Sequence, residues 1–154
     1  YQNNILPVQM ARLESLNDEL WVQSMVVSIG EDEFFRWHDS GDIQDVAHLE
    51  KIAAVCRATP NCKHWLPTRE YGIVTAFIAQ YELPDNLVIR LSAMFVDKPV
   101  VVPASLRGIA GITTSNVHRT IPIGSACNAP AQNGECRDCR KCWERDIPVS
   151  YHIH

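Results

Sequence analysis

Long hydrophobic runs are missing from this sequence. A membrane-spanning helix needs about 20 consecutive apolar residues, whereas the longest apolar runs here, near 25–29 and 100–102, have the length of core segments. The first residues, YQNNILPVQMARLESL, have no basic start followed by an apolar stretch, so they do not resemble a signal peptide. These features predict a protein that does not insert into a membrane.

An excess of basic residues is also missing. The 14 Lys and Arg residues are outnumbered by 18 Asp and Glu residues, which gives a net charge of -4. General binding of nucleic acid needs clustered positive charge, so the composition carries no strong nucleic-acid signal. Because 46% of the 154 residues are hydrophobic, the chain can bury a core, and its length predicts a single domain over 1–154.

Several common catalytic motifs are absent. The sequence contains no GxxxxGK[ST] phosphate loop, no GxGxxG dinucleotide fingerprint, no HExxH zinc motif and no GxSxG nucleophile elbow. These absences remove the motif-based grounds for a nucleotide-binding protein, a zinc peptidase or a serine hydrolase. They leave open whether the chain is an enzyme.

The sequence does contain an alternation of predicted strands and helices. Two helices are expected first, over 7–16 and over 18–29, with Asn17 as the N-cap of the second and Gly30 as its stop. Strands separated by helices of this length pair in parallel through right-handed crossovers. The fold class is therefore α/β, with a parallel sheet or a partial (β/α) barrel. The expected strands are 34–38, 63–67, 86–93 and 107–115, and the expected intervening helices are 45–60 and 71–83.

Polar side chains recur where the predicted strands end. In a parallel sheet these ends meet at one edge, where ligands usually bind. Such a pocket would suit a small anionic substrate, since it combines basic and hydroxyl groups. Five residues form the candidate pocket: Arg36, His38, Asp42, Arg69 and Ser92.

The most specific pattern lies near the C-terminus. Cys127, Cys136, Cys139 and Cys142 follow the spacing Cys-x8-Cys-x2-Cys-x2-Cys, in a segment (122–146) with little apolar material to hold it in place. A bound metal would supply that constraint. The stretch from Cys136 to Asp146 is compatible with a short helix. The four cysteines are therefore predicted metal ligands.

Three kinds of site fit four clustered cysteines. Structural zinc usually takes its ligands from two Cys-x-x-Cys pairs separated by a long spacer, whereas steps of three residues are the familiar way to hold a cubane cluster. The spacing therefore favours a [4Fe-4S] cluster over zinc, and disulfides are a third alternative. Four cysteines would fill all four irons. Arg137, Arg140 and Lys141 lie among the ligands and are placed to offset the negative charge of such a cluster.

Several of these segments together resemble a known family. The chain has WHDSGD at 37–42, PTRE at 67–70, RLSA at 90–93 and CNAPAQNGECRDCRKCW at 127–143. This order resembles a family of small, poorly characterised bacteriophage proteins whose typical pattern ends in a CxxCxxCW-like segment. Members often carry a further Cys-rich stretch ahead of the position of Tyr1, which this chain lacks, and the CxxxCxxC motif of radical-SAM enzymes is also absent.

The resemblance implies a viral protein of the host cytoplasm with an iron–sulfur cluster and a partial barrel like that of radical-SAM enzymes. With the cysteine spacing, it predicts a redox or electron-transfer role and a redox partner protein. Two alternatives stay open: an enzyme that acts on a small anionic substrate in the strand-end pocket, and a zinc-stabilised module that interacts with a host protein.

Overall fold

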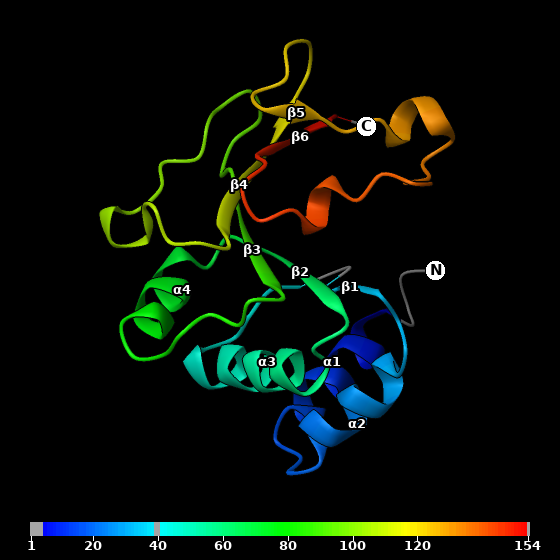
Figure 1. Cartoon of the computed structure of the whole chain (residues 1–154), viewed down its shortest axis with the longest axis vertical. Helices are drawn as coiled ribbons and strands as arrows, with labels where there is room; N and C mark the ends of the chain where they lie inside the picture. The colour runs from blue at the N-terminus through cyan, green and yellow to red at the C-terminus, as the bar shows by residue number, and fades with distance from the viewer. Residues whose placement is uncertain (1–4, 39–40, 154) are drawn as a thin grey trace.

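A computed structural model describes residues 5–38 and 41–153. Its centre is one six-stranded, all-parallel sheet in the order β1-β2-β3-β4-β6-β5, curled into half a barrel (Figure 1). The strands are β1 (Phe34–Arg36), β2 (Lys63–Thr68), β3 (Leu87–Ser92), β4 (Ile112–His118), β5 (Ser125–Ala126) and β6 (Val149–His152). The predicted α/β class and the partial barrel are confirmed.

The helices are interleaved with these strands. The α-helices are α1 (Ile5–Ser15), α2 (Trp21–Ile29), α3 (Val46–Ala58) and α4 (Tyr71–Ile78), and three short 3-10 turns are η2 (Ala104–Leu106), η3 (Ala129–Gln132) and η4 (Lys141–Trp143). Helices α2 and α4 both pack against α3 (Figure 1). No helix in the described ranges is both long and apolar enough to cross a membrane.

Local chemistry explains where these helices begin and end. The Asp45 carboxylate accepts the backbone N–H of His48 at 2.7 Å, which caps α3. Gly30 ends α2 with a positive φ of 53°. The predicted N-cap of α2 is wrong: the helix begins at Trp21, because the Asp18 side chain instead accepts the backbone N–H of Leu20 and forms a turn.

Two apolar cores lie on opposite faces of the sheet. The larger one joins the helices to the face that carries Leu87, Ile89 and Leu91. The smaller one contains Trp65, Cys142 and Val149, and Cys127, Trp143, Ile147 and Tyr151 pack against it. The C-terminal cysteine segment therefore covers the inner face of the half-barrel, on the side away from the helices (Figure 1).

Candidate functional site

The four predicted metal cysteines lie in or beside the segment that covers the inner face of the sheet. Cys127 follows β5, Cys142 lies in η4, and Cys136 and Cys139 lie in the loop between them. Cys142 is buried, with 8% of its surface exposed, whereas Cys136 is exposed and the other two are intermediate. Cys142 is near enough to Cys127 and Cys136 for their charges to raise the pKa of its thiol. All six cysteines of the chain are free thiols.

These thiols are not arranged around one ion. In the described part of the chain, no group of three or more His, Cys, Asp or Glu side chains is positioned to hold a single metal ion. The cysteine segment is also less regular than expected, since only Lys141–Trp143 of the predicted helix over 136–146 forms a helical turn. Metal binding by the four cysteines remains a prediction.

A buried arginine holds the cysteine segment on the sheet. Arg90, in the middle of β3, has no exposed surface. Its guanidinium donates to the backbone carbonyls of Cys142 (2.9 Å), Lys141 (2.6 Å), Glu144 (2.9 Å) and Ile147 (2.6 Å), and more weakly to Thr114 (3.3 Å). One side chain therefore fixes the turn that carries Cys142.

The charge of Arg90 has no carboxylate partner within ion-pair distance among the described residues. Burial lowers its pKa, and the largest opposing contributions come from Tyr151 and Cys142. An arginine nonetheless stays protonated in proteins. Glu144 also contributes through its charge, although its carboxylate makes no ion pair with Arg90.

The environment of Cys142 works in two directions. Burial raises the pKa of its thiol, while the Tyr151 hydroxyl, 3.3 Å from its Sγ, and the charge of Arg90 both lower it. Tyr151 is itself largely enclosed, and burial raises the pKa of its phenol, so it stays protonated and able to donate. Burial is the largest effect, so the pKa of the thiol is raised overall, and the two neighbours offset this only in part.

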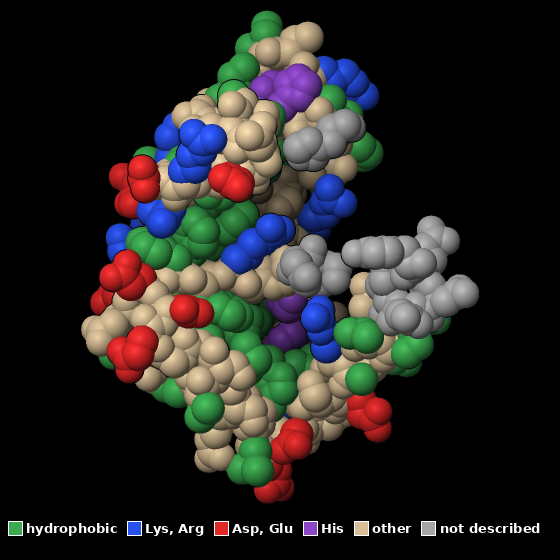
Figure 2. All heavy atoms as spheres, turned by 90° about the vertical axis from the view of Figure 1, so that its right-hand side faces the viewer, with side chains coloured by type: hydrophobic (Ala, Val, Ile, Leu, Met, Phe, Trp, Pro, Cys, Tyr) green, Lys and Arg blue, Asp and Glu red, His purple; other side chains and the backbone are tan. Residues whose placement is uncertain are grey.

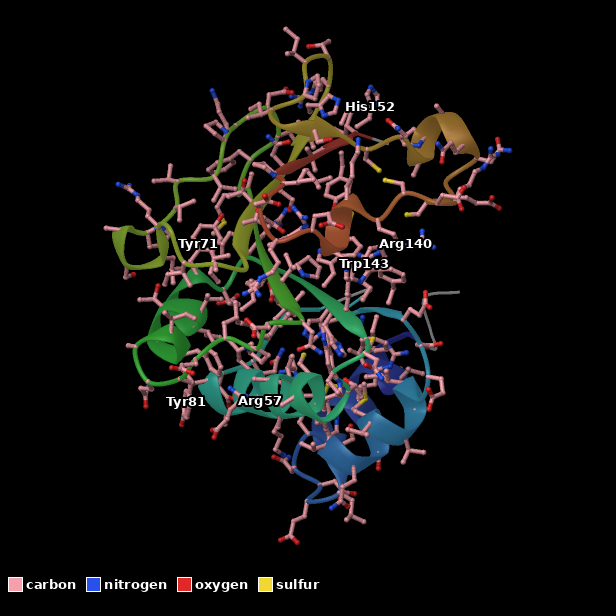
Figure 3. All side chains as sticks on the ribbon, in the orientation of Figure 1. Arg57, Tyr71, Tyr81, Arg140, Trp143 and His152 are labelled. Carbon is pink, nitrogen blue, oxygen red and sulfur yellow. The ribbon has the colours of Figure 1, made fainter. Side chains whose placement is uncertain are left out.

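Aromatic side chains connect the cysteine segment to the first two strands. The Trp143 ring contacts Phe34 and Trp65, each with 5.4 Å between centroids, and its Nε1–H donates to the Phe35 carbonyl at 3.0 Å. The Arg140 guanidinium lies 4.8 Å from the centre of the Phe34 ring. Figure 3 shows Arg140 and Trp143 together on the side of the sheet away from Tyr71 of α4.

The predicted strand-end pocket is only partly assembled. A cavity of about 740 Å³ lies at the carboxyl end of β1, between that strand end and helices α1 and α2. Three of the five candidate residues line it, namely Arg36, His38 and Asp42; Arg69 and Ser92 do not. Figure 2 shows histidine side chains at the bottom of this hollow, with basic and apolar side chains around them.

The other candidate residues have structural contacts that the sequence does not reveal. The Asp42 carboxylate accepts the Thr68 hydroxyl at 2.5 Å and the backbone N–H of Arg69 at 2.8 Å, and so ties the β1 loop to the end of β2. The Ser92 hydroxyl lies 3.3 Å from that of Ser115, and the Ser92 carbonyl accepts the Tyr71 hydroxyl. Asp42 and Ser92 therefore hold neighbouring strand ends together through these contacts.

Three lining residues determine the charge and the polarity of the cavity wall. The Arg36 guanidinium lies 4.8 Å from the centre of the Trp65 ring, on the same strand end that reaches the cavity. His48 accepts the backbone N–H of Gln44 at Nδ1, and burial lowers its pKa to about 4, so it is neutral near pH 7. His38 has a positive φ of 53°, a conformation that non-glycine residues adopt rarely. The cavity therefore offers two arginines, Arg12 and the stacked Arg36, and a neutral imidazole.

Sequence reasoning did not select Arg90 or Tyr151. Arg90 was visible as a charged residue inside an otherwise apolar strand, LVIRLS, which is the signal of a buried polar contact. Tyr151 gave no such signal, because its role depends on β6 lying beside β4, more than thirty residues earlier in the chain.

Comparison with known proteins gives one match. A family model described as gene product 88 matches residues 2–145 of the chain. Neither the curated proteins nor the solved structures contain a significant match.

Proposed function

The chain belongs to the gene product 88 family, a family of phage gene products, and from that premise we propose that Cys127, Cys136, Cys139 and Cys142 hold a [4Fe-4S] cluster with a redox or electron-transfer role. The observation that carries the proposal is the buried Arg90, which makes no ion pair among the described residues and donates to the carbonyl of Cys142. When bound, such a cluster supplies one-electron transfer.

Charge balance is the first argument. An uncompensated cation in a protein interior is costly, so buried arginines normally face an anion. Four thiolates around an oxidised [4Fe-4S] core leave about two negative charges. Arg90 lies within electrostatic range of Cys142, and Arg140 and Lys141 flank the same turn. A cluster at the four cysteines would give all three cations a counter-charge.

Hydrogen bonding is the second argument. Donors to the sulfur ligands of a cluster stabilise its reduced form and raise its reduction potential. The Tyr151 hydroxyl lies 3.3 Å from Cys142 Sγ and is kept protonated by burial. Trp65 and Trp143 enclose the same region and limit the access of water. Both features suit a redox-active cluster.

The spread of the thiols is the third argument. Ligands of a single zinc converge on one point, whereas a cubane presents four separate iron corners and accepts ligands that lie farther apart. Three of the thiols follow one another at steps of three residues and would each meet a separate iron corner, and Cys127 would supply the fourth ligand. A cluster that exchanges electrons also requires a partner, so the proposal includes a redox partner protein in the host cytoplasm.

The test is anaerobic purification of the full chain with metal and sulfide analysis. We expect brown protein that absorbs near ~400 nm, about four irons and four sulfides per chain, and loss of at least half of this iron in Cys139→Ala. The matched control is Cys62→Ser, a buried cysteine outside the segment, which should keep its iron. Colourless protein with one zinc per chain would support the zinc-stabilised host-interaction module instead, and full iron in Cys139→Ala would refute the ligand assignment.

A second candidate function rests on the cavity beside Arg36. We propose that it takes a small anion with an aromatic part, because two arginines and several aromatic rings line a single space. An enzyme acting on a small anionic substrate would use this cavity.

Its test uses the aromatic sulfonate 1-anilinonaphthalene-8-sulfonate as the probe. We expect Arg36→Gln to weaken binding about tenfold, in line with the loss of one charge-assisted contact. The matched control is Arg69→Gln, which does not line the cavity and should bind like the wild type. Equal binding by Arg36→Gln and the wild type would count against the assignment.

A further inference from the structure

Two histidines lie side by side at the carboxyl ends of β4 and β6, away from the proposed cluster and from the cavity. His118 and His152 are direct partners in the parallel register of these strands. Their ring centroids are 5.6 Å apart and their planes are nearly perpendicular, at 87°. His118 is 6% exposed and His152 is exposed. We propose that this pair binds a divalent transition-metal cation, such as Ni²⁺ or Zn²⁺, through the two Nε2 atoms.

Hydrogen bonds determine which nitrogen of His118 carries the proton. The Asn116 amide donates its N–H to the Ile123 carbonyl at 3.1 Å, so its oxygen faces Ser150 as an acceptor. The Ser150 hydroxyl therefore gives its one proton to Asn116. Its oxygen, 2.6 Å from His118 Nδ1, must then accept a proton from that nitrogen. His118 Nε2 is left with a free lone pair.

His152 is also protonated at Nδ1, and a single hydrogen bond is enough to show this. Its Nδ1 lies 2.6 Å from the Ile153 carbonyl, which can only accept, so Nδ1 carries the proton. Within the described ranges, no hydrogen bond is made to Nε2 of either ring. Metal-binding histidines almost always donate their other ring N–H to a carbonyl, carboxylate or similar group, which fixes the tautomer and orients the ring. Both members of the pair have that support.

The separation of the rings suits one shared ion. A metal about 2.1 Å from Nε2 lies about 3.2 Å from the centre of the imidazole ring, so two rings on one tetrahedral ion have centroids roughly 5.2 Å apart. The observed 5.6 Å differs from this by a few tenths of an ångström in a T-shaped or edge contact, so sharing one ion also requires the exposed His152 ring to turn its Nε2 toward that of His118. Imidazole is a preferred ligand of zinc, copper and nickel. The proposed site has two protein ligands, so its remaining positions are open to water or to an exchangeable ligand.

The surrounding charges are nearly balanced. The Asp97 carboxylate is near enough to His118 for the charge of the histidine to lower the pKa of the carboxyl, but its stronger contacts are with Arg119. The Arg119 guanidinium forms an ion pair with Asp97 at 2.5 Å. Asp97 and Arg119 together add little net charge, so affinity would come from the imidazoles. The site would therefore bind its metal through imidazole nitrogens, whereas the proposed cluster is held by thiolates. The inference does not depend on the proposed function.

The experiment is a calorimetric titration of Ni²⁺ into the full chain, purified anaerobically. We expect one Ni²⁺ per chain in the wild type and at least tenfold weaker binding in His152→Ala, which removes an exposed side chain and should not disturb folding. The matched control is His64→Gln, a buried histidine of β2 that contacts Phe35 and Trp37, which should bind within twofold of the wild type. The same titration of Cys139→Ala should still show the Ni²⁺ site, because thiols do not form it.

A second measurement tests the protonation argument without metal. Long-range ¹H–¹⁵N spectra of the imidazole rings should show the Nδ1–H tautomer for His118 and His152, and one equivalent of Zn²⁺ should shift both Nε2 resonances. The proposal is overturned if the wild type binds no Ni²⁺, if His152→Ala binds Ni²⁺ as tightly as the wild type, or if His118 is the Nε2–H tautomer.

Discussion

At the scale of single residues, Arg90 contributes more to holding the C-terminal segment on the sheet than any of the four cysteines in that segment. Its donors satisfy four carbonyls of the turn between Lys141 and Ile147, a segment with few apolar side chains of its own. Backbone carbonyls that are buried without a partner each cost about 1–3 kcal/mol. Removing this one side chain would leave several of them unsatisfied together.

We therefore expect Arg90→Met, which keeps the length of the side chain, to lower the free energy of unfolding by at least about 3 kcal/mol. The measurement is urea unfolding followed by far-UV circular dichroism. The matched control is Arg107→Met, because Arg107 is exposed and its Nε–H donates to only one carbonyl, that of Val102. Similar losses in the two variants would mean that the turn is held by other contacts.

At the scale of helices and strands, the sequence predicted the alternation well and the C-terminal third less well. Strands β2 and β3 lie within one or two residues of their predicted positions, because β-branched and aliphatic residues there are bounded by Pro and Asn. The fourth strand is displaced, to Ile112–His118, since Gly111 ends the turn before it. Helix α4 ends at Ile78, five residues before the predicted end at 83.

The pairing of the last strands could not be predicted. Strand β6 lies between β4 and β5, and β5 has only two residues. Such pairing depends on contacts between distant parts of the chain, which no local pattern encodes.

The candidate sites also depend partly on local sequence patterns and partly on contacts between distant parts of the chain. Spacing alone was enough to nominate the four cysteines, whereas the strand-end pocket was predicted from the rule that polar strand ends converge. That rule brought Arg36, His38 and Asp42 to one cavity. It did not foresee that Asp42 and Ser92 would bind neighbouring backbone groups, nor that α1 and α2 would form the opposite wall.

At the scale of the whole molecule, two buried histidines couple stability to pH. Burial lowers the pKa of His48 and of His64 from 6.5 to about 4. The unfolded chain therefore binds more protons than the folded chain between about pH 6.5 and pH 4, and stability falls as the pH falls through this range. At about pH 5 each histidine should lower the free energy of unfolding by about 2 kcal/mol relative to pH 7.

The measurement is urea unfolding at about pH 7 and about pH 5, in the wild type and in His48→Gln/His64→Gln. Glutamine keeps a polar side chain at both positions, including one that can reach the Thr59 hydroxyl, which lies 2.8 Å from His64 Nε2. We expect the variant to lose less stability between the two pH values than the wild type. Equal losses would assign the acid sensitivity to other groups.

The two outer strands of the half-barrel have a consequence for how the protein behaves at high concentration. An open sheet exposes unpaired backbone groups along both edges, and long edges recruit strands from other molecules. Here the edges are Phe34–Arg36 and Ser125–Ala126, three and two residues long. Neither offers enough backbone for a stable intermolecular ladder. The barrel can thus remain half open without offering an edge long enough to start a fibril.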